Sequence, residues 1–353
     1  MKSGLQSTSQ GGSLDTLAQT GTGVLENGMG IIQGDGSKFP GWDRLRAKTK
    51  RKVLAQVLAI NFVSISDSNN QPERTASYWN TYHCQNRLVS HNGALFGKYC
   101  KNRFCPLCSS IRKATIINAY LPEMRSWKDP HFLTLTAKSV SKRGLKKRMK
   151  DMNRAFGIIK ERMKKRHQRG KGPKPIGIKS LECNFNPVSK TYNPHFHLLV
   201  PDKETGELIK REWLKLWTQK FAISTAQKLV KVRDAESALV EVAKYSCKIF
   251  TEPDAKRQSR NKGKQKREIY IAALDNIFQA MQGLRIFERF GFNLPKQPKR
   301  ENKTRLISNF KEWVFAPEVY DWINPEDATR LSGYIMPADL EYLLFERINV
   351  GTT

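Results

Sequence analysis

The stretch GIKSLECNFNPVSKTYNPHFHLLV, residues 177–200, carries the side-chain pattern that decides the fold. Residues 177–186 and 193–200 read as two strands, and Asn, Pro and Ser open the loop between them. Short runs with strand-like alternation, separated by turn-forming residues, predict a β-hairpin. We therefore expect two antiparallel strands joined by a short loop.

The hairpin places its polar and apolar side chains on opposite faces. Residues two apart on a strand share a face, so His195 and His197 project together while Phe196 and Leu198 point into the core. With the register centred on the loop, Glu182 lies opposite His197 on that same face. A slip of one residue would turn Glu182 to the other face, so its position depends on the register.

Two imidazoles and one carboxylate on one face could bind a divalent cation and leave positions open for substrate oxygens. Two other interpretations stay open: a polar strand face with two ordinary histidines, and the two-histidine, one-carboxylate iron site of oxygenases. The charge of the chain disfavours the oxygenase, because an enzyme for small molecules has no need of a strongly basic surface.

The chain is strongly basic. Its 353 residues include 62 Lys and Arg against 32 Asp and Glu, a formal charge of +30, so a polyanion is the natural partner. A hydrophobic content of 39% excludes global disorder, and the length suggests about two domains. The longest mostly apolar stretch, residues 53–63, is too short to span a bilayer. We read no secretory signal and expect the chain to stay in the cytoplasm.

Positive charge is concentrated between residues 138 and 174, where sixteen Lys or Arg face two acidic residues. Within this block apolar residues recur every three or four positions, which predicts an amphipathic helix with a basic outer face. A solvated face is the alternative, but the one-sided sign favours phosphate contact. The apolar stripe of this predicted helix consists of Leu145, Met149, Met152, Phe156, Ile159 and Met163.

A second basic segment, residues 256–267, reads as a basic loop.

Both ends of the chain differ from its middle. Residues 1–40 are rich in Gly, Ser, Thr and Gln without an apolar period, which predicts a flexible tail. A helical pattern begins at Trp42 and runs to about Ile60. Residues 311–353 carry eight acidic and three basic side chains, a net charge of −5, so residues 1–310 carry +35. The acidic segment keeps several aromatic residues, and we expect it to pack.

Four of the six cysteines fall within residues 84–108. Cys105 and Cys108 form a C-x2-C pair, and Cys84 and Cys100 could complete a tetrahedral, structural zinc site. Four buried free thiols are the alternative, and His83 or His91 could replace an upstream cysteine. The isolated Cys183 and Cys247 read as small buried residues.

A third pattern is ESALVEVAKYSCKIF, residues 236–250, which reads as a helix. Glu241 and Tyr245 are four residues apart and therefore lie one turn apart on one face. Lys244 and Lys248 flank the tyrosine. A lone helical tyrosine is usually a packing residue, so its meaning depends on the other motifs.

Taken together, HFLTLTAK (131–138), PHFHLLV (194–200) and EVAKYSCK (241–248) resemble, in this order, the three motifs of HUH-type rolling-circle replication initiators. They are similar above all to the single-tyrosine plasmid Rep proteins of Gram-positive type, in which a glutamate precedes the nucleophilic tyrosine by one helical turn. The cysteine cluster also resembles the Cys-rich region of those proteins. The resemblance covers residues 84–248.

The resemblance implies an α+β fold with a central antiparallel sheet, flanking helices, the H-x-H strand in the middle and the tyrosine helix across the metal. Together with the composition of the two ends, which have no clear counterpart in the family, it gives four regions: a tail over 1–40, a helical and Cys-rich zinc-binding region over 41–125, an HUH nickase domain over 126–300 and an acidic segment over 301–353. His131 then starts a strand, and Thr134 and Thr136 serve the sheet.

The resemblance also implies residue roles. Tyr245 would cut one DNA strand and stay joined to the 5′ phosphate, which frees a 3′ hydroxyl for the host polymerase. His195 and His197 would hold Mg²⁺ or Mn²⁺, with Glu182 as third ligand. Glu241 would activate water at termination. A lysine such as Lys248 could stabilise the phenolate.

The implied partners are plasmid origin DNA, single-stranded at the nick site, and the host helicase and polymerase. Within the superfamily, a transposase or phage initiator is the alternative, although a second tyrosine would then be expected where Glu241 stands. Outside the enzyme class, the alternative is a zinc-dependent nucleic-acid-binding protein without nuclease activity.

Overall fold

The computed structural model describes residues 22–24, 30–33, 37–38, 41–243, 268–295 and 304–350. Most of the predicted tail, the predicted basic loop over 256–267, Tyr245 and Lys248 lie outside these residues. The chain divides into two compact units that are interleaved along the sequence. The first contains residues 1–56, 80–101 and 297–336, and the second contains residues 57–79, 102–296 and 337–353. The division into four consecutive regions stays a proposal.

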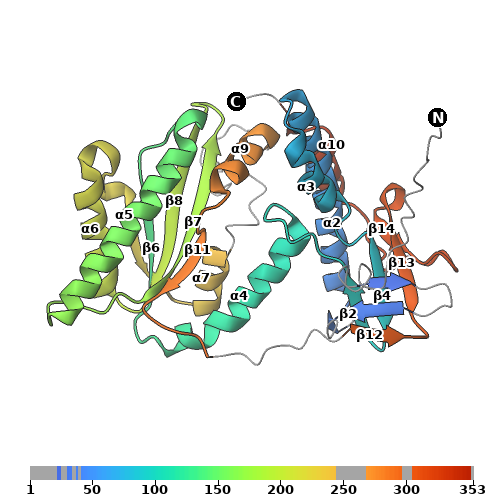
Figure 1. Cartoon of the computed structure of the whole chain (residues 1–353), viewed down its shortest axis with the longest axis horizontal. Coiled ribbons are helices and arrows are strands. Elements are labelled where there is room, and N and C mark those ends of the chain that lie inside the picture. Colours follow the sequence, from blue (N-terminus) through green and yellow to red (C-terminus); the bar gives the residue numbers. More distant parts are fainter. Residues whose placement is uncertain are drawn as a thin grey trace, which may run out of the picture. The chain divides into compact units, whose positions relative to one another are not determined.

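The second unit is built on a five-stranded antiparallel sheet in the order β11-β7-β8-β6-β9 (Figure 1). The H-x-H strand, β8, is the middle strand of this sheet. The predicted α+β class with a central antiparallel sheet is therefore confirmed. The strands are β6 (His131–Thr136), β7 (Gly177–Asn186), β8 (Thr191–Val200), β9 (Lys228–Lys231) and β11 (Phe287–Phe290).

Helices α5 (Lys142–Gln168), α6 (Lys203–Phe221) and α9 (Ile271–Met281) supply the core on one face of this sheet. The predicted stripe of α5 is buried, and each of its six side chains is at most 1% exposed. It packs with Phe196 and Leu198 of β8, which confirms the predicted direction of these two side chains. At the start of α6, Oδ1 of Asp202 accepts a hydrogen bond of 2.7 Å from the Thr205 amide, a typical N-cap.

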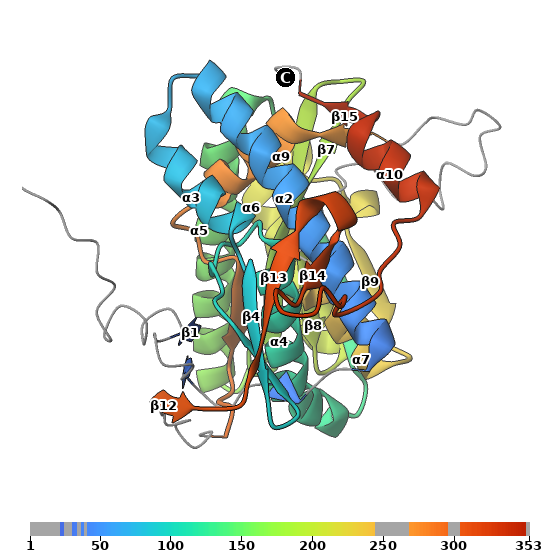
Figure 2. The ribbon, with the colours of Figure 1, turned by 90° about the vertical axis from the view of Figure 1, so that its right-hand side faces the viewer.

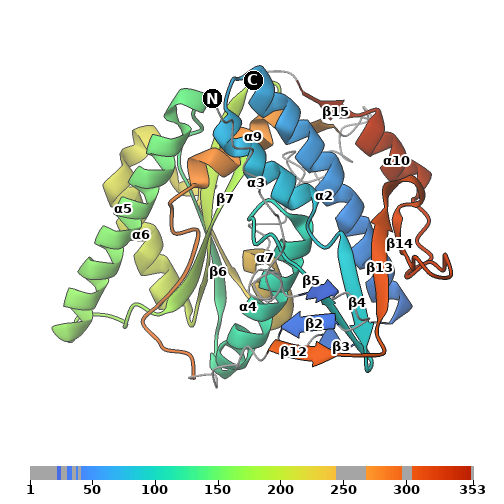
Figure 3. The same cartoon turned by 45° about the vertical axis from the view of Figure 1, so that its right-hand side comes forward.

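The opposite face of the sheet carries helices α4 (Pro106–Ser126) and α7 (Ala235–Ala243), as Figures 1 and 3 show. Leu239 and Val242 of α7 pack in one cluster with Ile178 and Leu199 of the sheet. Leu199 lies on the same face of β8 as His195 and His197, and Ile178 lies directly opposite Leu199 on β7. Helix α7 therefore covers the histidine face, while α5, α6 and α9 cover the other.

The first unit contains a five-stranded sheet in the order β14-β13-β4-β5-β3. Figure 2 shows its strands β14, β13 and β4, and Figure 3 labels all of its strands. The acidic segment takes part in it, because β13 pairs antiparallel with β4. Trp313, Phe315 and Trp322 are buried, which confirms that this segment packs. The strands are β3 (Ser37–Lys38), β4 (Arg87–His91), β5 (Ala94–Gly97), β13 (Lys311–Ala316) and β14 (Asp321–Ile323).

Helix α2 (Trp42–Ser68) begins where the helical pattern begins but continues eight residues beyond Ile60. Helix α3 (Pro72–Tyr82) follows it. Among the residues described above, no helix is both long and apolar enough to cross a membrane. The remaining elements are β1 (Thr22–Val24), β2 (Gly30–Gln33), β10 (Ile269–Tyr270), β12 (Thr304–Ile307), α10 (Ala338–Phe345), β15 (Ile348–Asn349) and two short 3-10 turns, Ser224–Ala226 and Pro317–Val319.

Candidate functional site

The hairpin of β7 and β8 brings Glu182, His195 and His197 onto one face of the sheet. Glu182 lies directly opposite His195, and Ser180 lies opposite His197. The predicted register, with Glu182 opposite His197, is wrong by two residues, because β8 already begins at Thr191 and the loop is shorter than predicted. A shift of two residues preserves the face of every side chain. Glu182 therefore still joins both histidines.

These three side chains direct ligand atoms at one point. Nε2 of His195 and Nε2 of His197 each lie 3.8 Å from Oε2 of Glu182. The two imidazole rings are 4.8 Å apart between centroids and inclined by 72°. Glu182 and His195 are buried, and the side chain of His197 is 12% exposed. A carboxylate at such a depth needs positive charge beside it, which a protonated ring or a bound cation supplies.

The hydrogen bond of His195 prepares the ring for metal binding. Its Nδ1 lies 3.0 Å from the carbonyl oxygen of Asn193. A carbonyl oxygen only accepts, so the neutral ring carries its proton on Nδ1 and keeps the lone pair of Nε2 toward Glu182. One ligand atom from each of Glu182, His195 and His197 fits within a group 4.8 Å across. The residues thus fit a divalent cation with positions left for other oxygens.

Strand β6 closes one side of this site. Thr134 lies opposite His197 and Thr136 opposite His195. The backbone of Thr136 is held on both sides, because its amide donates to Oε1 of Gln227 at 2.7 Å and its carbonyl accepts from Nε1 of Trp213 at 3.0 Å. These contacts agree with a role for the two threonines in the sheet.

His131 does not take part in the group of metal ligands. It is the first residue of β6 and lies on the face opposite the histidine pair. Its Nδ1 lies 2.7 Å from the carbonyl oxygen of Asp129. The sequence motif that begins with His131 therefore contributes a strand rather than a ligand.

Helix α7 runs over the histidine face and carries Glu241, which is half-buried. Leu239 and Val242 fix this helix to the sheet, and its last described residue, Ala243, is buried in the same cluster. Tyr245 follows two residues later in the sequence, and both it and Lys248 lie outside the described residues. The described part of α7 thus covers the face that carries the ligand atoms and ends two positions before Tyr245 in the sequence.

The four clustered cysteines form a second group of potential ligands. One sulfur from each of Cys84, Cys100, Cys105 and Cys108 lies within 4.8 Å of the others. The Cys100 amide donates to Sγ of Cys84 at 3.4 Å, and Cys105 is the N-cap residue of α4. Four thiols in this arrangement match the donor set of a tetrahedral zinc site, which leaves no position open for a substrate.

Two nearby histidines and one further described cysteine are not part of this cluster. Neither His83 nor His91 belongs to the group of four sulfurs. Cys183 is buried in the core on the α5 side of the sheet, and this burial raises the pKa of its thiol. Cys247 lies outside the described residues.

Two residues of the metal face were not predicted from the sequence. Asn193 orients His195 through its backbone carbonyl, and Phe132 places its ring 5.1 Å from that of His197. Asn193 could have been found, because it shares the parity of the two histidines on the same strand. Phe132 comes from β6, and only the pairing of β6 with β8 brings it there.

Comparison with known proteins gives a consistent picture. A model of the family Rep_1, described as "Replication protein", matches residues 94–312. The chain is similar to "Protein rep" of Staphylococcus aureus, with 34% identity over 165 residues, or 42% of this chain and 69% of the relative. The matched region contains Glu182, His195 and His197 and three of the four clustered cysteines, whereas Cys84 precedes it.

Two further relatives are less similar. "Protein rep" of Streptococcus pneumoniae serotype 2 is 24% identical over 220 residues, or 56% of this chain and 66% of the relative. "Protein rep" of Bacillus amyloliquefaciens is 27% identical over 183 residues, or 42% of this chain and 51% of the relative. No solved structure matches the chain.

Proposed function

Because the chain belongs to the Rep_1 family of replication proteins, we propose that it starts rolling-circle replication of a plasmid by cutting one strand of the origin. A single observation carries the proposal. Glu182, His195 and His197 converge beneath helix α7, which continues in sequence to Tyr245. The described residues thus supply a potential cation site beneath the helix whose sequence leads to the proposed nucleophile.

Tyr245 is the proposed nucleophile. Its oxygen attacks the scissile phosphorus, the bond from phosphorus to the 3′ oxygen breaks, and a phosphotyrosine forms with the 5′ phosphate. The phenolic proton leaves, the departing 3′ oxygen takes up a proton, and the resulting hydroxyl primes synthesis by the host polymerase. A phenol with a pKa near 10 is a poor nucleophile, so a nearby cation such as Lys248 would favour the phenolate.

Nε2 of His195, Nε2 of His197 and a carboxylate oxygen of Glu182 would hold Mg²⁺ or Mn²⁺. When bound, such an ion withdraws electron density from the scissile phosphate and offsets the charge that develops on it. The chain's own contribution is orientation: the Asn193 carbonyl holds the His195 ring, and Phe132 lies against His197.

Glu241 has a separate proposed role. It stands four residues before Tyr245 in the sequence, the spacing of one helical turn, and we propose that both residues act on the same phosphate. At termination its carboxylate would take a proton from water, so that water instead of a second tyrosine cuts the regenerated site. The strand would then be released without a new covalent link.

The basic outer face of α5 would grip the DNA backbone. Its Lys and Arg residues lie opposite the buried stripe and give affinity without reading sequence. Plasmid origin DNA is the proposed partner, and a host helicase would supply the single strand for extension.

The test is formation of a covalent adduct. Wild-type protein incubated with Mn²⁺ and a single-stranded oligonucleotide bearing the nick site should give a slower band on a denaturing gel. Tyr245→Phe should abolish that band, while Tyr342→Phe, an exposed tyrosine on α10, should keep it. Glu241→Ala should form the adduct but release fewer closed circles. An adduct that persists in Tyr245→Phe, or none with wild type, would overturn the assignment.

We also propose that the cysteine cluster binds one structural zinc ion. The observation behind this is the grouping of four sulfurs within 4.8 Å. Elemental analysis should find about one zinc per chain, and removal of the metal should unfold this region, because zinc binding and folding are coupled in such sites. A zinc-free chain that folds normally would refute the proposal.

A further inference from the structure

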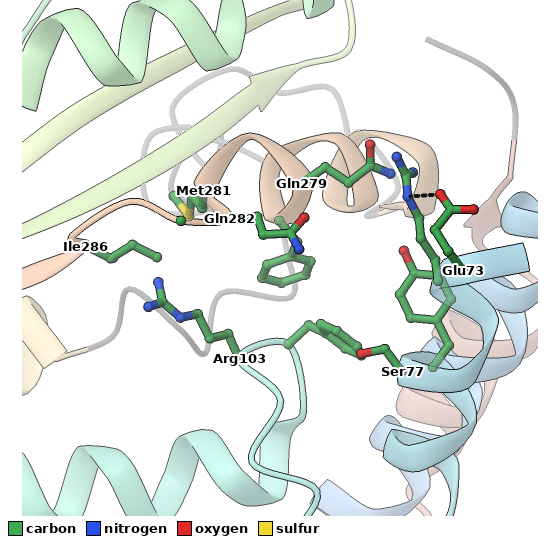
Figure 4. A pocket seen from close by; sticks show the side chains of 12 residues that line it. Glu73, Ser77, Arg103, Gln279, Met281, Gln282 and Ile286 are labelled. Atoms are coloured by element: carbon green, nitrogen blue, oxygen red, sulfur yellow. Dashed lines mark ion pairs between the residues drawn. The ribbon is translucent and has the colours of Figure 1, made fainter. Parts of the chain in front are cut away.

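A pocket lies between α3, α9 and the loop that precedes α4 (Figure 4). Its volume is about 410 Å³, at the small end of the range for ligand pockets. None of its lining residues belongs to the Glu182 group or to the four cysteines. The pocket therefore requires an explanation of its own.

Aromatic rings form the apolar wall of this pocket. Phe104 packs against Tyr78 and Phe278, with ring centroids 5.4 Å and 5.7 Å apart. Phe104 and Phe278 are half-buried, so part of each ring remains accessible. A half-buried ring offers a surface on which a flat, unsaturated group can stack.

Polar groups border the same space. Figure 4 shows Arg103 and Gln282 approaching the pocket from the loop before α4 and from the end of α9. Arg74 is already engaged, with Glu73 at 3.7 Å and Asp275 at 3.6 Å. Arg103 is exposed and forms no ion pair within the described part of the chain. Its guanidinium group is thus available for an anion, and the Gln282 amide offers both a donor and an acceptor.

The loop that carries Arg103 and Phe104 is fixed before any ligand arrives. Nδ2 of Asn102 donates to the Ser77 carbonyl at 2.8 Å, and Oγ of Ser109 donates to the Arg103 carbonyl at 2.9 Å. In the sequence this loop lies between Cys100 and Cys105 of the cysteine cluster. A loop held at both sides loses little entropy on binding.

The back wall of the pocket is also ordered. The hydroxyl group of Tyr78 and the amide of Gln279 both donate to the carboxylate of Asp275. Burial raises the pKa of Asp275, and burial together with this carboxylate raises the pKa of Tyr78. The Tyr78 hydroxyl and the Asp275 carboxylate therefore already bind each other. Arg103, Phe104 and Gln282 remain to contact a ligand.

We propose that this pocket binds one unstacked nucleobase of single-stranded DNA, with the adjacent phosphate on Arg103. The ring of Phe104 would stack on the base, and Gln282 would meet its hydrogen-bonding edge. A base with its phosphate combines the flat face, the polar edge and the negative charge that these groups match. The inference rests on the proposed function, since it assumes that the chain binds DNA.

Binding of a fluorescent oligonucleotide without divalent metal tests the proposal separately from strand cleavage. Phe104→Leu keeps apolar volume but removes the ring, and should weaken binding of single-stranded DNA roughly 5- to 100-fold. Phe345→Leu, a half-exposed phenylalanine on α10 of the same unit, is the matched control and should bind like wild type. Duplex DNA of the same sequence should bind both variants equally, because its bases remain stacked.

Arg103→Gln tests the phosphate contact and, because Arg103 is exposed, does not endanger folding. It should lower the slope of log affinity against log salt by about 0.7, whereas Phe104→Leu should leave the slope unchanged. Equal affinity of Phe104→Leu and Phe345→Leu, with an unchanged slope in Arg103→Gln, would overturn the base pocket. Loss of a protein partner in Phe104→Leu at unchanged DNA affinity would likewise overturn it. Wild-type protein that binds no single-stranded DNA would instead refute the proposed function itself.

Discussion

The two faces of the β11-β7-β8-β6-β9 sheet use alternate residues of the same strands for different purposes. On β8, Phe196 and Leu198 are fully buried beneath α5 and α6, while His195 and His197 face α7. One position along the strand separates a residue that holds the fold from one that offers a metal ligand. Substitutions at adjacent positions should therefore affect different properties, stability on the α5 side and ion binding on the α7 side.

One residue on the apolar α5 side is charged. Lys179 has a side chain only 1% exposed, and its Nζ lies 4.3 Å from the ring centroid of Phe196 and 4.9 Å from that of Phe156. Glu288 accompanies it, with Oε1 at 3.0 Å. Burial lowers the pKa of Lys179 to about 8, even though Glu288 acts in the opposite direction. The packed face thus contains a buried ammonium group that has the Glu288 carboxylate beside it and donates to Oδ1 of Asn153 at 2.7 Å.

The largest effect on stability should come from Phe196→Ala. Its ring is fully buried and contacts Phe156 and Trp213, with centroids 5.7 Å and 5.8 Å away. Loss of a buried phenylalanine leaves a cavity and costs about 3–5 kcal/mol in the free energy of unfolding. Denaturant titration measures this cost. Val188→Ala in the exposed hairpin loop should change the same quantity by less than about 0.5 kcal/mol, and an equal loss in both variants would remove the distinction.

The next effect should come from Glu288→Gln. This change leaves the Lys179 ammonium group buried against aromatic rings without its carboxylate, which should cost about 3 kcal/mol. Burial opposes ionisation of Glu288, but Lys179 and Lys160 outweigh it and hold the pKa of Glu288 below its usual range. Adding Lys179→Met to Glu288→Gln should restore most of the lost stability. A double variant as unstable as Glu288→Gln would show that the buried charge is not the cause.

The same pair gives a pH dependence with a definite sign. Because the pKa of Lys179 is about 8 in the folded chain and 10.5 ordinarily, the unfolded chain binds more protons between these values. The free energy of unfolding should therefore rise with pH in this window, by up to about 1.4 kcal/mol per pH unit, relative to Lys179→Met. Subtracting the curve of Lys179→Met removes the contribution of other groups. A difference that falls with pH would contradict the lowered pKa.

The sequence predicts which side chains lie on each face of the hairpin, because side chains alternate between the faces with a period of two. The error of two residues in the predicted register leaves this assignment unchanged. The actual pairing, Glu182 with His195, depends on where β8 begins, and the composition of the loop does not specify that residue. The stripe of α5 was predictable for the same reason as the hairpin. Local periodicity thus determines which face a side chain takes, but not its partner.

Features made from distant segments could not be predicted in this way. Lys179 reads as a polar strand residue, and only the pairing of β7 with β11 brings Glu288 to it. The pocket at Phe104 combines residues of α3 and α9, which are about 200 positions apart in the chain. The cysteine cluster was predictable because its spacing is local, whereas these contacts arise only from tertiary structure.

The smallest effect on stability, and the sharpest test of the two faces, should come from His197→Ala. The side chain is 12% exposed and lies on the α7 side, so its loss should change the free energy of unfolding of metal-free protein by about 1 kcal/mol, well below the cost of Phe196→Ala. Mn²⁺ at 100 times its dissociation constant should raise the stability of wild type by about 2.7 kcal/mol, and this increase should vanish in His197→Ala. Thr134→Ser, directly opposite on β6, should keep it.

These outcomes separate an ion site from a packing position. If metal-free His197→Ala lost several kcal/mol, the histidine face would serve the core as Phe196 does. If the variant kept the full response to Mn²⁺, the three ligand atoms would not form the site. Only a stable variant that no longer responds to Mn²⁺ agrees with a face built for an ion, since a ligand contributes to stability only when its ion is bound.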